Sequence, residues 1–199
     1  NMELKELDCL FNGLRELDLS KNIKLEKLYY QYNQLDNLDL SNNLELKELN
    51  CANNQLTDLD ISKNIKLEKL YCCDNQLYYL DLSNHIELIY LNCEKNQLSS
   101  LDLSNNLKLK ELDCSENQLT DLDISKNIKL ENLQCRYNQL SSLDIRPLIN
   151  LEKLNCCNQA EGFILYLTKE QKSKFTVADY CDAILKEDKS ICEIEWLDI

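Results

Sequence analysis

The sequence predicts a repeat solenoid of the α/β class, built mostly from short parallel strands with few helices and closed by a C-terminal capping segment. Three observations predict it. A cysteine recurs at a spacing of 21 residues, leucines recur at fixed offsets around it, and an asparagine stands three residues after the cysteine position in every turn but the last. Self-similarity at a period of about 20 to 50 residues is the signature of stacked repeats, each of which is one supersecondary unit.

The cysteine register marks eight turns, the second of which carries Tyr30 instead of cysteine. Within L-x-x-L-x-C, alternate residues point to one face of a short strand, so strands of successive turns stack into a parallel sheet about 4.8 Å apart. The pattern predicts seven apolar positions per unit that face inward, over an array covering residues 1–159. The seven cysteines of the register are Cys9, Cys51, Cys72, Cys93, Cys114, Cys135 and Cys156.

Stacking decides the chemistry of these cysteines. Equivalent side chains about 4.8 Å apart exceed the usual Cβ separation of a disulfide, roughly 3.5 to 4.5 Å. We therefore predict buried free thiols that pack as small hydrophobic groups where leucine would overfill the layer. Zinc needs four convergent ligands, whereas this column is a line. No metal ion and no cofactor is expected.

The recurring asparagines indicate how the backbone groups of each turn find hydrogen-bond partners. A side-chain amide can donate to and accept from backbone groups that a turn leaves unpaired. The chain has only two glycines and one proline, so few turns can be built from glycine. His85, the sole histidine, stands where other repeats carry asparagine, and we interpret it as a tolerated substitute in a turn. The predicted ladder comprises Asn12, Asn33, Asn54, Asn75, Asn96, Asn117 and Asn138.

The unit resembles a known family. The 21-residue period with a cysteine column, as in Leu67, Leu70, Cys72, Asn75 and Leu77, is similar to the leucine-rich repeats of cysteine-ladder internalins and related bacterial surface proteins. The resemblance covers residues 1–159. It implies an exported adhesin or host-interaction module that binds its ligand on the sheet.

The two halves of the unit vary differently among repeats. In the second half the outward residues are uniform, with aspartate from Asp18 to Asp144 in one column and serine two residues later in six of seven turns. We interpret this column as capping of turn N–H groups. Calcium binding along the column is the alternative, because carboxylates are hard oxygen ligands.

In the first half the outward residues differ in every turn, and tyrosines stand amid mixed charge. A phenol offers a large contact area with a polar end, which is typical of recognition surfaces. The alternative is that tyrosine suits exposed strands through β-propensity and that unconstrained positions drift apart. The candidate binding residues are Tyr29, Tyr32, Lys69, Tyr71, Asp74, Tyr90, Glu94, Arg136 and Tyr137.

The net charge and the absence of catalytic motifs limit which classes of partner and activity are expected. A formal net charge of −13 disfavours nucleic acid and anionic lipid, and no apolar run is long enough to span a membrane. None of the motifs H-E-x-x-H, G-x-S-x-G or G-x-G-x-x-G occurs, so no enzyme activity is predicted. We expect a monomeric, extracellular or cell-surface module for a protein or glycan ligand. The alternatives are an intracellular scaffold, favoured by many free thiols, and a targeting domain of a larger enzyme.

Both ends depart from the repeat. The first residues align with the interior of a unit, so a cap or further repeats are expected upstream of Asn1.

Near the other end Pro147 interrupts the unit, and the stretch 156–159 reads as though one residue were lost. Residues 160–199 are predicted to form a cap, with a strand at 163–167, a helix within 169–186 that begins at a capping box of Thr168 and Gln171, and an extended segment at 194–199. Phe163, Phe175, Ile184 and Trp196 are expected to cover the last turn, and Cys181 and Cys192 could form a disulfide there.

Overall fold

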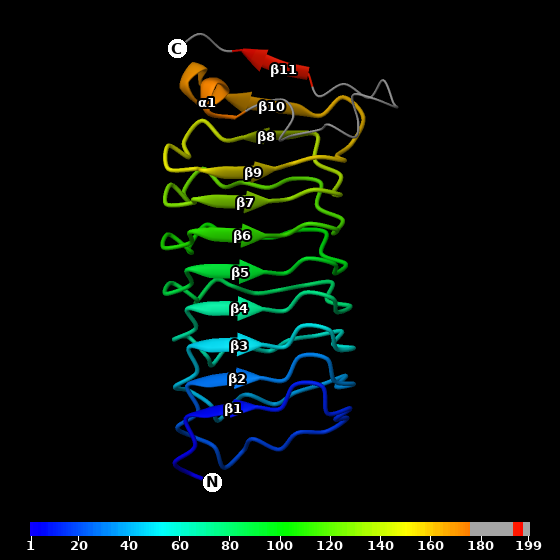
Figure 1. Cartoon of the computed structure of the whole chain (residues 1–199), viewed down its shortest axis with the longest axis vertical. Coiled ribbons are helices and arrows are strands. Elements are labelled where there is room, and N and C mark those ends of the chain that lie inside the picture. Colours follow the sequence, from blue (N-terminus) through cyan, green and yellow to red (C-terminus); the bar gives the residue numbers. More distant parts are fainter. Residues whose placement is uncertain (176–192, 197–199) are drawn as a thin grey trace.

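The computed structural model describes residues 1–175 and 193–196 of the chain. One short strand per turn stacks in single file along the molecule, which confirms the predicted solenoid (Figure 1). The strands form a parallel sheet in the order β1-β2-β3-β4-β5-β6-β7-β9, and each residue pairs with the one 21 positions later. The strands are β1 Glu6–Asp8, β2 Lys27–Tyr29, β3 Glu48–Asn50, β4 Lys69–Tyr71, β5 Tyr90–Asn92, β6 Glu111–Asp113, β7 Asn132–Gln134 and β9 Lys153–Asn155.

A second sheet closes the C-terminal end. Its parallel strands lie in the order β11 (Glu193–Trp196), β10 (Ile164–Leu167) and β8 (Ser142–Asp144). Helix α1 (Lys169–Lys174) begins with the predicted capping box, in which the Thr168 hydroxyl accepts from the Gln171 N–H and the Gln171 side chain accepts from the Thr168 N–H. Phe163 and Phe175 are buried as expected. Ile184, Cys181 and Cys192 lie outside the described residues, as does the side chain of Trp196.

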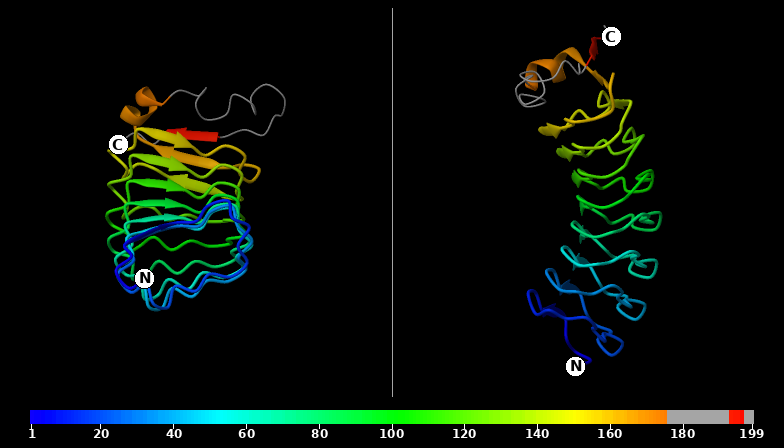
Figure 2. Two further views of the ribbon diagram at one scale, coloured as in Figure 1. Left: turned by 60° about the horizontal axis from the view of Figure 1, so that its bottom comes forward. Right: turned by 90° about the vertical axis from the view of Figure 1, so that its right-hand side faces the viewer.

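The core lies between two walls of the flattened turns. Strands β1 to β7 and β9 form one wall, and irregular extended chain forms the opposite wall as far as β8, which lies in that wall and belongs to the second sheet (Figure 2). In each turn three side chains from the sheet wall meet three from the opposite wall, as Leu67, Leu70 and Cys72 meet Leu77, Leu80 and Leu82. One continuous apolar cluster results.

The prediction of a seventh inward apolar position is wrong. Residues of this column, such as Ile65 and Ile86, are 53% and 57% exposed, while the preceding residues Asn64 and His85 are buried. The reason is hydrogen bonding: the asparagine turns inward to reach backbone carbonyls, so its neighbour points outward. The exposed column comprises Ile23, Leu44, Ile65, Ile86, Leu107, Ile128 and Ile149.

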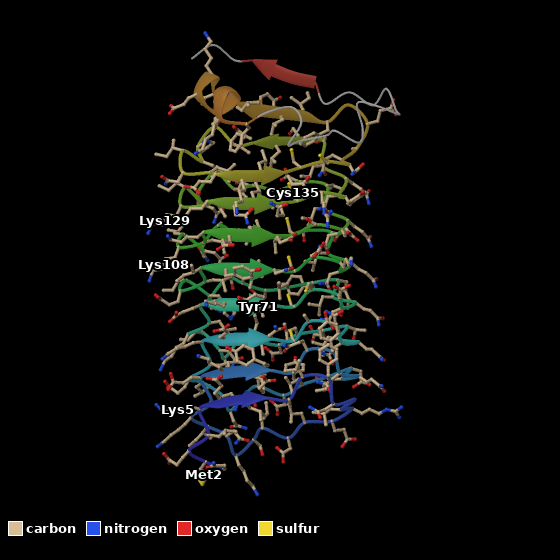
Figure 3. All side chains as sticks on the ribbon, in the orientation of Figure 1. Met2, Lys5, Tyr71, Lys108, Lys129 and Cys135 are labelled. Atoms are coloured by element: carbon tan, nitrogen blue, oxygen red, sulfur yellow. The ribbon has the colours of Figure 1, made fainter. Side chains whose placement is uncertain are left out.

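The cysteine column is a stack of buried thiols. Sulfur atoms follow one another through the interior around the labelled Cys135 (Figure 3). Cys51, Cys72, Cys93, Cys114 and Cys135 are free cysteines without exposed surface, and burial raises the pKa of Cys93 well above its ordinary value. Tyr30 continues the column, fully buried beside Cys51.

The predicted asparagine ladder satisfies the backbone of two turns at once. The Asn75 amide donates to the carbonyls of Cys72 in its own turn and Cys51 in the preceding turn, at 3.2 and 3.0 Å, while its oxygen accepts from the Leu56 N–H at 3.1 Å. Gln159 occupies the equivalent position in the last turn, 21 residues after Asn138, and repeats the bonds through Cys135 and Leu140. The reading that one residue is lost at 156–159 is therefore wrong.

A second amide ladder lies at the next corner of each turn. The Asn64 amide donates to the carbonyls of Leu40 and Asn43 at 3.1 and 2.9 Å. His85 takes the same place but reaches only the Ile61 carbonyl, at 3.2 Å through Nε2, and its Nδ1 is buried without a partner. The histidine is a substitute in the ladder, as predicted, with one bond fewer.

The aspartate column caps the opposite wall as predicted. The carboxylate of Asp81 accepts from the Ser83 N–H at 2.9 Å, and Asp18, Asp39, Asp60, Asp102 and Asp123 repeat this bond two residues ahead. Hydrogen bonds from the serine backbone and hydroxyl lower the pKa of Asp81 below its ordinary value.

Substitution of Cys93 tests the packing of the thiol layer. Cys93→Leu should lower the free energy of unfolding by about 1–3 kcal/mol because the layer is already filled. Cys93→Ser should cost about 1–3 kcal/mol because it buries a hydroxyl in an apolar layer. Urea denaturation measures both, with Cys73→Ser, on the half-buried outward side of the strand, as the control. Full stability of Cys93→Leu would show unfilled space instead.

Substitution of His85 tests the second ladder. His85→Asn adds the missing amide bond and should raise the free energy of unfolding by about 1 kcal/mol at neutral pH. Burial lowers the pKa of His85 below 6.5, so the unfolded state binds the proton first and the parent loses stability as pH falls below 6.5.

The advantage of His85→Asn should therefore grow between pH 7.5 and 5, and denaturation at both values measures it. His85 is the only histidine, so other groups titrate alike in both proteins. A difference that is constant across this range would contradict the assignment.

Candidate recognition surface

The parallel register places outward side chains of the sheet in straight rows. Residues 21 apart are direct neighbours, so Tyr29, Asn50 and Tyr71 follow one another in one row, and Lys69 and Tyr90 are neighbours in the next. The surface that they form is called the sheet face below. Tyr71 lies on β4, in the middle of this face (Figure 3).

Three tyrosines form the centre of the sheet face. The rings of Tyr71 and Tyr90 lie 4.5 Å apart between centroids at an interplanar angle of 33°. Tyr29, two turns before Tyr71, interacts with the carboxylate of Glu48. All three are half-buried. Burial, and after it the charge of Glu48, raises the pKa of Tyr29 to about 12.

The candidates Lys69 and Asp74 are each already paired with an opposite charge. Lys69 lies 4.0 Å from Glu48, and Lys95 lies 3.6 Å from Asp74. These pairs are exposed to solvent and contribute little to stability. Lys69 is the register neighbour of Tyr90, whereas Asp74 lies at the turn beside Lys95.

A row of left-handed residues follows the sheet. Tyr32, Asp74 and Tyr137 adopt φ angles of 57°, 52° and 53°. Each donates its N–H to the next turn, as Asp74 does to the Glu94 carbonyl at 2.9 Å. Exposed Phe11 stacks on Tyr32 with a centroid separation of 4.3 Å, a pair that the sequence did not reveal because phenylalanine at a turn carries no distinct pattern.

Glu94 and Arg136 meet although two turns separate them. The Arg136 guanidinium donates to Glu94 at 3.1 Å, lies 3.7 Å from Glu116, and stands 5.7 Å over the ring of Tyr137. Ser115, in the turn between, is fully buried. The predicted residues thus form separate groups: Tyr29, Lys69, Tyr71 and Tyr90 at the centre, Asp74 beside Lys95, Tyr32 with Phe11, and Glu94, Arg136 and Tyr137 toward the C-terminal end.

The opposite wall holds a shallow groove of about 540 Å³. Its lining includes Ser99, Ser100 and Tyr79 together with Asp81, Asp102 and Asp123. The inner oxygen of each aspartate is already bonded to a serine N–H. Within residues 1–175 and 193–196, no three His, Cys, Asp or Glu side chains gather as metal ligands would.

Solved structures share this architecture. The functional domain of InlJ from Listeria monocytogenes, which includes a cysteine ladder, superposes with a TM-score of 0.69 at 31% identity over 84% of this chain. The chain is an internalin-like leucine-rich repeat protein. Internalin C2 of the same organism gives a TM-score of 0.70 at 22% identity over 82% of this chain and 80% of its own.

More distant repeat proteins share the fold alone. The leucine-rich repeat protein LIC12759 of Leptospira interrogans matches with a TM-score of 0.61 at 20% identity, over 98% of this chain and 61% of its own. This chain spans 41% of the InlJ domain. Comparison with protein-family models and with curated sequences gives no match. The likeness suggests a protein-interaction module, and no described helix is long and apolar enough to cross a membrane.

Titration of Tyr29 tests the electrostatics of the sheet face. Because the pKa of Tyr29 is raised to about 12, its phenol stays neutral while an unfolded tyrosine ionises near pH 10. The folded protein should lose stability as pH rises from about 10 toward 12.

Glu48→Gln removes the main electrostatic cause and should lower the pKa of Tyr29, though not to 10, since burial is the largest cause. Residue-resolved NMR titration of the tyrosine rings measures both proteins. Glu16→Gln, an exposed change on the opposite wall, is the charge-matched control. An unchanged pKa in Glu48→Gln would contradict the assigned contact.

Proposed function

We propose that this protein is a non-catalytic recognition module that binds a macromolecular ligand on its sheet face. The observation that carries the proposal is the contrast between two walls with the same repeat. The opposite wall repeats aspartate and serine in nearly every turn, each used to cap its own turn. The sheet face has a different set of side chains in each turn, among them the half-buried Tyr29, Tyr71 and Tyr90, of which the last two are in ring contact.

Tyrosine gives this surface its binding potential. A phenol that is already half-buried and held by its neighbours loses little entropy on binding and offers both an apolar face and a hydroxyl. The Tyr71–Tyr90 contact and the Glu48 carboxylate beside Tyr29 restrict the rings before a ligand arrives. A preorganised surface of this kind favours affinity by lowering the cost of ordering.

Similar proteins support a protein ligand. The leucine-rich repeat ectodomain of the plant receptor kinase GASSHO1/SCHENGEN3 from Arabidopsis thaliana was solved in complex with CASPARIAN STRIP INTEGRITY FACTOR 2; it is 22% identical to this chain over 75% of it, with a TM-score of 0.63. The resemblance to internalins extends the proposal to an exported bacterial protein that contacts a host or neighbouring cell. We place a protein first and a glycan second among ligands.

A pair of matched variants tests this function. The parent, Tyr29→Ala/Tyr71→Ala/Tyr90→Ala on the sheet face and Tyr78→Ala/Tyr79→Ala on the opposite wall serve as baits for host-cell and bacterial surface extracts. Tyr78 and Tyr79 are exposed, so the control removes aromatic surface without touching the sheet face. Mass spectrometry identifies the captured partner, and titration of that purified partner gives its dissociation constant.

The sheet-face variant should lose affinity at least about tenfold, the usual scale for aromatic anchors, while the control binds as the parent does. Circular dichroism and denaturation establish that both variants fold. Equal capture by both variants would move the site away from the tyrosines, and loss in the control alone would place it on the opposite wall.

A further inference from the structure

Charges on the sheet wall alternate from turn to turn and pair across the register. Glu6 lies 3.4 Å from Lys27, and Glu48 lies 4.0 Å from Lys69. The next column does the same, with Glu26 between Lys5 at 3.0 Å and Lys47 at 2.8 Å. Each carboxylate thus meets a cation in an adjacent turn.

The alternation stops in the fifth turn. Tyr90 follows Lys69 where the pattern calls for glutamate, and Ile89 follows Glu68 where it calls for lysine. The register then places Glu111 between Tyr90 and Asn132. Within residues 1–175 and 193–196 no ion pair includes Glu111, and its side chain is exposed.

The break creates a distinct local chemistry. Tyr90, whose ring is tilted against that of Tyr71, is the register neighbour of Glu111. Burial raises the pKa of both phenols, and the charge of Glu111 adds to this effect. Asp113, on the same strand as Glu111, adds a second carboxylate, one oxygen of which accepts from the Ser115 N–H at 3.0 Å. Lys69, the neighbouring cation, is directed to Glu48. Two aromatic rings therefore lie near the carboxylates of Glu111 and Asp113, and within the described chain neither carboxylate belongs to an ion pair.

We propose that Tyr71, Tyr90 and Glu111 bind an arginine side chain of a protein ligand. A cation is attracted to the face of an aromatic ring, and the planar guanidinium stacks on aromatic rings while its N–H groups pair with a carboxylate. The acidic chain, with a net charge of −13, favours a basic ligand segment. This inference rests on the proposed function and specifies its ligand.

Two peptides that differ in one group test the inference. The probe is a short glycine- and serine-rich peptide with a single arginine, and its twin carries citrulline, which keeps the shape and removes the charge. NMR shift titration gives both affinities and maps the contact. The parent should bind the arginine peptide about three- to tenfold more tightly, the range expected of a cation–π contact with an ion pair.

Matched variants locate the preference. Tyr90→Leu and Glu111→Gln should each bring the two affinities close to equality. Tyr78→Leu and Glu16→Gln remove a phenol ring and a carboxylate charge from the opposite wall, and they should leave the preference for the arginine peptide intact. Equal affinity of the parent for both peptides would overturn the inference. So would loss of the preference in Glu16→Gln, because that result indicates attraction to net charge alone.

The outcome is separable from that of the proposed function. If a captured partner depends on the sheet-face tyrosines but the parent shows no preference for arginine, the recognition function stands and the arginine site does not. If the arginine peptide binds at Tyr90 but no macromolecule depends on the sheet face, the site exists and the proposed function fails.

Discussion

The side-chain amide is the interaction on which the rest of the structure depends. A 21-residue turn made with two glycines in the whole chain leaves corner carbonyls and N–H groups inside the molecule, where each unpaired group costs roughly 1–3 kcal/mol. The asparagines supply both partners, and they do so across turns: the Asn96 amide donates to Cys72 and Cys93, and its oxygen accepts from Leu77. Every turn thereby completes the backbone of the one before it, which fixes the period at 21 residues and keeps the strands in register.

The apolar core cannot by itself distinguish one turn from the next, because leucine and cysteine repeat at every level. Charge can. The alternation of Glu45 with Lys66 at 2.6 Å, and of Glu87 with Lys108 at 2.6 Å, gives the solenoid a two-turn period on top of the 21-residue one. Omission of one turn would preserve the core but bring like charges together. Exposed pairs add little stability, so their contribution here is to the specificity of the register.

The repeat made most of the fold predictable. The period, the inward leucines, the buried thiols and the capping box of Thr168 follow from spacing and residue type, and the structure confirms them. The seventh apolar column was misassigned because hydrophobicity alone predicts that Ile65 is buried and Asn64 exposed, whereas the unpaired carbonyls of the preceding turn draw the asparagine inward. Gln159 was misread for a related reason, since a longer amide can make the same bonds as asparagine.

The candidate site was only partly accessible from sequence. Variation among repeats singles out the sheet face, and the register then makes Tyr71 and Tyr90 neighbours. Contacts that skip a turn, such as Glu94 with Arg136, depend on side-chain length over the small, buried Ser115 and have no sequence pattern. Pairs formed at turn corners, such as Phe11 with Tyr32, depend on a left-handed backbone.

That left-handed row links strain to recognition. Eight residues other than glycine hold φ angles between 52° and 57° at the same corner of successive turns, a conformation that costs L-residues roughly 1–2 kcal/mol each. Glycine would remove the cost, yet the chain keeps phenylalanine, tyrosine, asparagine, aspartate, lysine and glutamate there. Bonds such as the Tyr137 N–H to the Cys157 carbonyl at 2.9 Å hold the backbone in place. These positions keep a strained backbone and, with it, varied side chains that point outward beside the sheet. Such retention is expected of a recognition surface rather than of a scaffold.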